Sequence, residues 1–476
     1  MTQQIATAKA QGLFAVSVRF TRVKFTKHIL SRYGNDEQEF ESARYYKGVQ
    51  IIVKKQVCIM LKNKYGNYNL GKGGTQMGTT LQETPSGNRL HIGIFGKTNS
   101  GKSAFINAFS GQAVSIVADV KGTTTDPVYK TMEIAPLGPC VLIDTAGFDD
   151  EGELGAMRME KTALAAQKTE LALIVFASED MEKELEWFRY FQEKKTPVIP
   201  VVSKSDLRSD EENQEFAEKL REQTKEKVCI VSAKTGAGIA ELKEWMIRMV
   251  PEGFGGRTIT GDLVSEGEVV LLVMPQDIQA PKGRLILPQV QTMRELLDKK
   301  CIVLSTTTDK LVEAMDQLKN PPKLIITDSQ VFDYVYDHKP TESLLTSFSV
   351  LFADYKGDLD YYKEGAKKLM NLSSDSRVLI AECCTHAPLK EDIGREKIPR
   401  MLKKKYGETL KVTVVSGTDY PKDLTSYDLI IQCGACMFNR KYVLHRIQQA
   451  KNQGVAMTNY GVAIAQLKGI LDKIVC

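Results

Sequence analysis

The 476-residue sequence contains no uninterrupted apolar run of the roughly 18 residues that a membrane-spanning helix needs. It also lacks a signal peptide, which would combine a basic start, an apolar stretch and a cleavage site of small residues. With 42% hydrophobic and 26% charged residues, the composition is that of a globular protein in solution. We therefore expect a cytoplasmic protein with no membrane partner.

Cysteine and histidine are scarce, with nine and five residues respectively. An odd, scattered set of cysteines argues against the disulfide framework of a secreted protein and favours reduced thiols, some of them metal ligands. The stretch IIQCGACMFNR places Cys433 and Cys436 in a C-x-x-C pair. That spacing suits a zinc site, a redox pair, an iron-sulfur site or two ordinary apolar side chains, so the pair alone does not decide.

Most of the chain lacks a basic excess. Residues 1–76 hold 13 Lys/Arg against 4 Asp/Glu, which leaves 51 against 55 for the rest. We therefore expect no nucleic-acid partner, because such a protein needs basic residues gathered on a folded face. Residues 1–76 are interpreted as an N-terminal extension. It could be an organellar transit peptide, a disordered tail or, the interpretation that we favour, sequence upstream of a natural start at Met77.

A phosphate-binding loop follows. The stretch RLHIGIFGKTNSGKSAFINAFSGQ predicts a buried strand, a glycine turn and a helix, and it contains the P-loop pattern G-x4-G-K-S. In this motif backbone N–H groups face the phosphates, the lysine reaches the β and γ phosphates, and the serine hydroxyl ligates Mg²⁺. The nucleotide-binding residues predicted here are Gly96, Asn99, Ser100, Gly101, Lys102 and Ser103.

Two more motifs follow in the order that a GTPase requires. VLIDTAGFDD ends a hydrophobic strand with Asp144, which is expected to hold Mg²⁺, and continues to Gly147, whose N–H can sense the γ-phosphate. KGTTTDP supplies Thr124 and Thr125, either of which could close on the magnesium ion. We expect GTP hydrolysis to depend on Lys102, Asp144, Gly147, Thr124 and Thr125, with Ser103 and Asp144 as magnesium ligands.

The stretches VIPVVSKSDL and VCIVSAKTG end two further strands with residues for the base. The Asp206 carboxylate can accept from both N1–H and the exocyclic amine of guanine, a pattern that adenine does not offer. This predicts a GTP-specific site. Ser203 stands where the motif usually has Asn, so we expect looser nucleotide binding. The predicted base-binding residues are Lys204, Asp206, Ser232, Ala233 and Lys234.

These motifs resemble the potassium-activated branch of translation-factor-related GTPases, which includes tRNA-modification and ribosome-assembly GTPases. Asn99 matches the residue that helps to coordinate K⁺ in that branch. Phe148 stands where Ras-like enzymes have the glutamine that orients the attacking water. The resemblance therefore implies slow GTP hydrolysis that K⁺ activates.

The predicted fold class is α/β, in a three-domain chain. We expect a P-loop GTPase domain over 77–255, because a Gly/Pro cluster typical of a linker follows. Strands and helices alternate over 260–342, which predicts a small α/β module with three parallel strands and a dimerising role. The alternation continues over 343–476, the expected cluster-binding domain.

In the last domain, RVLIAECCTH and YDLIIQCGAC each end a strand with cysteines. Ligands collect beyond the carboxyl ends of parallel strands, so Cys384 can supply a third thiol beside Cys433 and Cys436. Three thiolates suit an iron-sulfur cluster, and three thiolates with His386 suit a closed zinc site. Inert cysteines are the third interpretation. The candidate ligands are Cys384, His386, Cys433 and Cys436, and Cys383 is expected to be dispensable.

The stretches NRLHIGIFGKTNSGKSAFINAFSGQ, GTTTDPV, CTHAPLKEDIGREKIPRML and CGAC resemble the HydF family of FeFe-hydrogenase maturation GTPases, over residues 77–476. The resemblance implies a 4Fe-4S cluster held by Cys384, Cys433 and Cys436, a homodimer, and a scaffold for a transferable two-iron cluster. It also implies the FeFe-hydrogenase apoprotein and the maturases HydE and HydG as partners. Gln432 stands where this family often has His, which leaves a fourth ligand open.

The competing hypothesis is a potassium-activated GTPase of tRNA modification or ribosome assembly with a C-terminal zinc domain. The slightly acidic body of the chain and the three thiols at strand ends favour the scaffold. A redox enzyme that uses Cys433 and Cys436 would need a helix beginning at the first cysteine, and no resolving chemistry is visible nearby.

Overall fold

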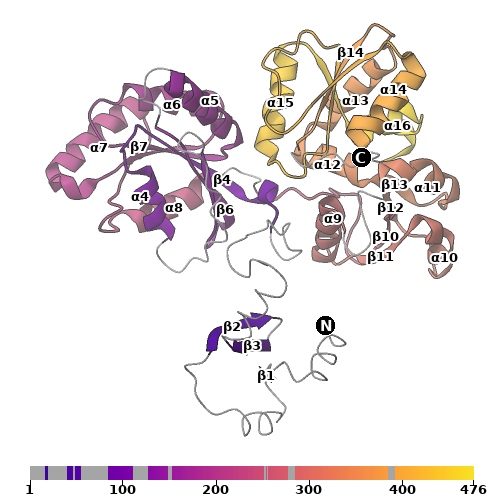
Figure 1. The fold of residues 1–476 in the computed structure, drawn as a ribbon, viewed down its shortest axis with the longest axis horizontal. Coiled ribbons are helices and arrows are strands. Elements are labelled where there is room, and N and C mark those ends of the chain that lie inside the picture. The colour runs from indigo at the N-terminus through magenta and orange to yellow at the C-terminus, as the bar shows by residue number, and fades with distance from the viewer. Residues whose placement is uncertain are drawn as a thin grey trace. The chain divides into compact units, whose positions relative to one another are not determined.

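Figure 1 shows the computed structural model of residues 1–476, which divides into two compact units, Met1–Thr80 and Leu81–Cys476. We describe each unit by itself. The structure describes the backbone of three strands in the first unit, and in the second unit the ranges 84–110, 127–147, 153–250, 254, 256–276, 285–383 and 392–475.

The three strands of the first unit form an antiparallel sheet in the order β1-β3-β2. They span Ser17–Arg19 (β1), Phe40–Tyr46 (β2) and Val49–Lys54 (β3). The remainder of the predicted extension, 1–76, lies outside the described residues.

The second unit begins with a six-stranded sheet in the order β5-β6-β4-β7-β8-β9, in which only the edge strand β5 runs antiparallel to its neighbour. Its strands are β4 (Leu90–Phe95), β5 (Val128–Ile134), β6 (Gly138–Asp144), β7 (Leu171–Phe176), β8 (Val198–Val202) and β9 (Cys229–Ile230). Its helices are α4 (Lys102–Ser110), α5 (Glu153–Lys168), α6 (Glu182–Glu193), α7 (Asp210–Thr224) and α8 (Ile239–Met249).

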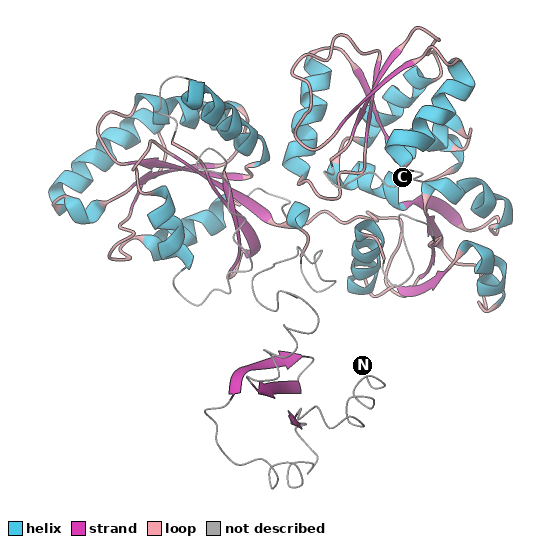
Figure 2. Cartoon of the chain, in the orientation of Figure 1, coloured by secondary structure: helices cyan, strands magenta, loops and turns pink. Residues whose placement is uncertain are grey.

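Helices cover both faces of this sheet (Figure 2). On one face, Phe105 and Phe109 of α4 and Leu242 of α8 pack against the strands, and on the other, Phe188 of α6 and Phe216 of α7 do so. Strands β4, β7 and β8 are buried along their whole length, which explains their near-continuous apolar sequences. This arrangement is the doubly wound α/β fold of a P-loop domain.

The next module has a parallel sheet in the order β11-β10-β12-β13. Its strands are β10 (Val269–Val273), β11 (Ile302–Thr306), β12 (Leu324–Thr327) and β13 (Leu344–Ser347), and its helices are α9 (Leu287–Asp298), α10 (Leu311–Asp316), α11 (Phe332–His338) and α12 (Phe348–Lys356). From the sequence, three strands and a boundary at residue 342 are expected here. The sheet has a fourth strand, β13, which begins beyond that position.

The last module repeats the pattern, with a parallel sheet in the order β15-β14-β16-β17. Its strands are β14 (Arg377–Ala381), β15 (Lys411–Val415), β16 (Leu429–Gln432) and β17 (Ala456–Asn459). Its helices are α13 (Leu359–Leu369), α14 (Ile398–Tyr406), α15 (Arg440–Asn452) and α16 (Tyr460–Leu467), with one π-helical turn at Ile393–Lys397 ahead of α14.

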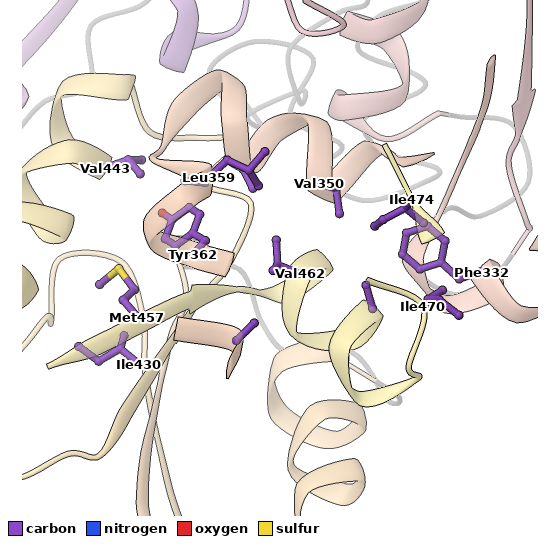
Figure 3. Close-up of a cluster of buried hydrophobic side chains, with 14 of the residues drawn as sticks. Phe332, Val350, Leu359, Tyr362, Ile430, Val443, Met457, Val462, Ile470 and Ile474 are labelled. Atoms are coloured by element: carbon purple, nitrogen blue, oxygen red, sulfur yellow. The ribbon is translucent and has the colours of Figure 1, made fainter. Parts of the chain in front are cut away.

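One hydrophobic cluster joins the last two modules (Figure 3). Phe332 and Val350 come from the first of them, and Tyr362, Met457 and Val462 come from the second. All five side chains are at most 1% exposed. Because the two sheets share this core, we expect them to unfold together. Among the residues that the structure describes, no helix is long and apolar enough to cross a membrane.

Candidate nucleotide and cysteine sites

The P-loop connects β4 to α4 and curls around the ammonium group of Lys102. Lys102 Nζ donates to the carbonyl oxygens of Gly96 (2.8 Å) and Lys97 (2.7 Å), and the side chain is 7% exposed. Asn99 and Gly101 adopt positive φ angles of 60° and 97°. A Cβ atom at Gly96 would lie 2.7 Å from Val175 O, so only glycine fits against β7.

The two predicted magnesium ligands meet directly. Ser103 Oγ donates to Asp144 Oδ2 at 2.7 Å, while Asp144 Oδ1 is buried and has no hydrogen-bond partner among the described residues. Burial raises the pKa of Asp144, partly offset by the Ser103 hydrogen bond and by the charge of Lys102. A buried carboxylate with an unpaired oxygen beside a hydroxyl fits a Mg²⁺ ion.

Gly147 lies against the P-loop. A Cβ atom there would approach Thr98 Oγ1 to 2.1 Å and Thr98 N to 2.5 Å, so any side chain would displace the loop. The Gly147 backbone is therefore next to the place where a γ-phosphate would lie. The predicted switch residues Thr124 and Thr125 lie outside the described residues.

The base-recognition motifs also come together, on the loops after β8 and β9. Ser232 Oγ donates to Asp206 Oδ1 at 2.6 Å, and this bond is the main cause of the lowered pKa of Asp206. Ser203 Oγ donates to the carbonyl oxygens of Ser100 (2.7 Å) and Phe176 (3.2 Å). Ser203 therefore links the base motif to the P-loop, a role that the sequence did not indicate. The predicted base-binding residues Lys204, Ala233 and Lys234 lie on the same loops. Lys204 and Ala233 are half-buried, and Lys234 is exposed.

The cysteines lie at the carboxyl ends of the neighbouring strands β14 and β16, where Ala381 pairs with Gln432. The backbone N–H of Cys383 donates to Cys433 Sγ at 3.1 Å, and hydrogen bonding from Cys383 lowers the pKa of Cys433. Cys433 and Cys436 are both half-buried. The two remaining predicted ligands, Cys384 and His386, lie outside the described residues, and the described part of the chain contains no group of three or more metal-binding side chains.

Two buried cations contact the segments that carry these cysteines, and neither was predicted from the sequence. Lys356 is 2% exposed, and its ammonium donates to the carbonyl oxygens of Ala435 (3.2 Å), Cys436 (3.3 Å) and Phe438 (2.7 Å). Arg446 is 1% exposed, with Nη1 3.6 Å from Cys383 Sγ. Neither residue lies in a recognisable motif. Lys356 is the last residue of α12, and Arg446 is a buried residue of α15.

The side chain of Gln432 connects Cys383 with Arg446. Its Nε2 donates to Cys383 Sγ at 3.0 Å, and its Oε1 accepts from Arg446 Nη1 at 3.3 Å. Buried cations need a nearby anion, since the cost of removing them from water is otherwise large. A cysteine pair beside these cations therefore suits an anionic ligand at this edge of the sheet.

Three family models match the chain. The 50S ribosome-binding GTPase model matches residues 91–204, the Hydrogen maturase F dimerization domain matches 259–357, and the Hydrogen maturase F tetramerization domain matches 360–476. The chain belongs to the hydrogen maturase F (HydF) family. The predicted family, the α/β class and the P-loop GTPase domain are thereby confirmed, and the chain carries two domains of this family named for oligomerisation.

Curated relatives match part of the chain. A tRNA modification GTPase MnmE of Endomicrobium trichonymphae is 27% identical, over 52% of this chain and 52% of its own length. A GTPase Der of Wolinella succinogenes is 34% identical, over 38% of this chain and 40% of its own. The chain thus spans about half or less of the length of each of these relatives. Among solved structures, the G domain of the T. maritima FeoB iron transporter is 21% identical, with 34% of this chain and 99% of that chain covered and a TM-score of 0.27.

Proposed function

We propose that this HydF-family chain hydrolyses GTP and serves as a scaffold that binds a 4Fe-4S cluster and carries the two-iron subcluster of FeFe-hydrogenase. The observation that supports this most is a pair of buried cations beside the cysteine loops, Lys356 at the carbonyl oxygen of Cys436 and Arg446 at the sulfur of Cys383, in a chain whose first α/β domain is a GTPase domain. We further propose three functional domains and a homodimer as the basic assembly. The GTPase domain spans 77–255, and the predicted division of the rest into 260–342 and 343–476 moves toward the C-terminus, because β13 and α12 belong to the middle domain.

In the nucleotide half, GTP binds with its phosphates on the P-loop and its guanine on Asp206. Ser103 and Asp144 hold Mg²⁺, and Asn99 contributes to a K⁺ site. Water attacks the γ-phosphorus, the bond to the β–γ bridging oxygen breaks, and GDP and phosphate leave. Lys102 would stabilise the charge that develops on the phosphate oxygens, and Mg²⁺ and K⁺, when bound, would supply further positive charge there. Thr124 and Thr125, which lie outside the described residues, are the proposed switch residues that would bind Mg²⁺.

In the cysteine half, Cys384, Cys433 and Cys436 hold the cluster as thiolates. The cluster supplies an iron atom at which a cargo can attach, since three protein thiols leave one position open, where His386 is a candidate ligand. Gln432 orients Cys383, and the N–H of Cys383 donates to the Cys433 sulfur. We propose HydE and HydG as the partners that load the cargo and the FeFe-hydrogenase apoprotein as its acceptor. Because free thiolates persist in a reducing compartment, we propose a cytoplasmic location.

Anaerobic reconstitution followed by metal analysis and EPR spectroscopy tests this function. The scaffold requires about four irons per chain and a reducible cluster signal. One zinc per chain without iron would instead support the GTPase with a zinc domain, and would contradict the proposal. Replacing Cys383 with Ala serves as the matched control, because this adjacent thiol is not a proposed ligand and the cluster should be retained.

A further inference from the structure

A cavity of about 740 Å³ is lined by residues from all three modules of the second unit. The turn ahead of β4, the loops ahead of β7 and β8, the end of α12 and the start of α15 all contribute to its lining. Sites for small molecules typically have volumes of roughly 300 to 1,000 Å³. The cavity is therefore large enough for a ligand of the size of a small metabolite.

The lining of this cavity is strongly cationic. Its charged residues are five cations and one carboxylate: Lys195, Arg257, Lys356, Arg440, Lys441 and Glu170. The charge of Arg257 is partly compensated, because its Nη2 lies 3.4 Å from Asp354 Oδ2. The Glu170 carboxylate already accepts from the backbone N–H of His91 at 3.0 Å. The cavity thus carries an excess of positive charge.

Arg440, the first residue of α15, has no anion of its own. Its guanidinium makes no hydrogen bond or ion pair with the part of the chain that the structure describes, although its Nε is buried. Burial lowers the pKa of Arg440, and the charge of Arg257 acts in the same direction. Burial also lowers the pKa of the neighbouring Lys441, as does the charge of Lys194. Cations withdrawn from water without a partner are costly, so this pair favours an anion in the cavity.

The wall of the cavity beside Lys356 is closely packed. A Cβ atom at Gly87 would lie 2.8 Å from Lys356 Nζ and 2.6 Å from the carbonyl oxygen of Phe438, so the turn ahead of β4 fits directly against the loop after β16. The next residue, Asn88, donates from Nδ2 to the Tyr355 hydroxyl at 3.5 Å. Asn88 Oδ1 is buried and accepts no hydrogen bond from the described residues, so it can accept one from a hydroxyl group of a ligand.

We propose that this cavity binds a small phosphorylated organic molecule, with its phosphate on Arg440 and Lys441. A guanidinium presents parallel N–H donors that match two oxygens of a phosphate, and a lysine adds a compact charge. The lining also contains Tyr355, Phe254 and Leu444, whose apolar surface suits an organic group rather than a free inorganic ion. Leu444 lies one helical turn after Arg440, so the charged and apolar parts of the lining are adjacent on α15.

The proposed site contains no residue of the P-loop and no cysteine, so it is separate from the proposed function. Isothermal titration calorimetry of the full-length protein with phenyl phosphate tests it, with saturating GDP and Mg²⁺ present to keep the P-loop occupied. We expect phenyl phosphate to bind, and inorganic phosphate to bind more weakly because it lacks the apolar group. Arg440→Met should weaken the binding of phenyl phosphate by roughly tenfold or more, because the charge-assisted hydrogen bonds are lost.

Arg400→Met is the matched control. Arg400 is exposed on α14, with Nη2 3.7 Å from Glu396 Oε2, and its loss should leave the affinity for phenyl phosphate unchanged. Lys441→Met should weaken binding as Arg440→Met does, and it provides the comparison if Arg440→Met does not fold. Unchanged GTP turnover in either variant shows that the fold is retained.

Three results would overturn the inference. The first is no binding of phenyl phosphate by the unaltered protein, and the second is equal affinity in the unaltered protein, Arg440→Met and Lys441→Met. The third is phenyl phosphate that binds no more tightly than inorganic phosphate, which would indicate an adventitious ion only. Because the titration needs no iron, each of these results would leave the proposed scaffold function in place.

Discussion

The nucleotide site and the cysteine site are both built at the carboxyl ends of parallel strands, but they are held together differently. Nucleotide-site residues stand in recognisable short motifs, and residues of different motifs bond to one another, as Ser103 does with Asp144 and Ser232 with Asp206. The cysteine site is lined by Lys356 and Arg446, which stand in no motif and are nearly fully buried. Tertiary packing assembles both sites, but only the residues of the first are marked by motifs in the sequence.

The largest effect should follow from breaking the cysteine pair. Cys433→Ser or Cys436→Ser is expected to reduce cluster content to near zero, because serine is a harder and less acidic ligand than a thiolate. Iron analysis after reconstitution measures this. GTP turnover should persist in both variants, since the nucleotide site satisfies its own groups, and its loss would show that the two sites are not separable in this way.

Asp206→Asn should come next, with a loss of GTP affinity of roughly 10- to 100-fold, because the amide has a single acceptor oxygen and turns its own N–H group toward one of the two donors of guanine. The same variant should favour xanthosine triphosphate, whose keto oxygen accepts from the amide. Nucleotide titration measures both affinities. Unchanged GTP binding would remove Asp206 from the base site.

The difference between the two sites explains what could be predicted from sequence. Asp144, Gly147 and Asp206 stand in motifs whose spacing fixes their place in a P-loop domain, so their neighbourhood was predictable. The cation shell was not, because Arg446 looks like any arginine on an amphipathic helix until α15 packs against the sheet. Gln432 illustrates the same limit, since the sequence indicated only a missing histidine and not a contact with Cys383.

The substitutions Gly147→Ala and Gly434→Ala test how much room each site leaves for a side chain beside its backbone. A Cβ at Gly147 would meet Thr98 Oγ1 at 2.1 Å, while one at Gly434 would have nothing within 4 Å. We expect Gly147→Ala to slow GTP turnover by roughly tenfold or more, as the loop must shift away from the γ-phosphate. Gly434→Ala is the matched control and should retain both turnover and cluster content. Equal turnover in the two variants would contradict the tight contact.

Gln432→Ala should have a smaller effect, a decrease in the free energy of unfolding. It removes the donor to Cys383 and one acceptor of Arg446, which keeps its bond to the carbonyl oxygen of Gly417. A buried donor left without its partner costs about 1 to 3 kcal/mol of unfolding free energy. Denaturant unfolding of the apoprotein measures this. Gln448→Ala, on the exposed face of α15, is the control that should be neutral. A neutral Gln432→Ala would mean that Arg446 does not depend on this amide.

The smallest effect is expected at the surface pair Glu160–Lys422, which joins α5 to the cysteine module. Water screens both side chains, so Glu160→Gln should leave the melting temperature unchanged within error. A measurable drop would show that this pair helps to hold α5 against the cysteine module.

The central claim is that one chain joins a GTPase domain to a cluster scaffold, and hydrogenase activation tests it most directly. Protein isolated from cells that also contain HydE and HydG is mixed anaerobically with FeFe-hydrogenase apoprotein, and hydrogen evolution is measured. The account predicts activity with the unaltered protein and none with Cys436→Ser prepared in the same way. Equal activation by the two proteins, or none by either, would contradict it.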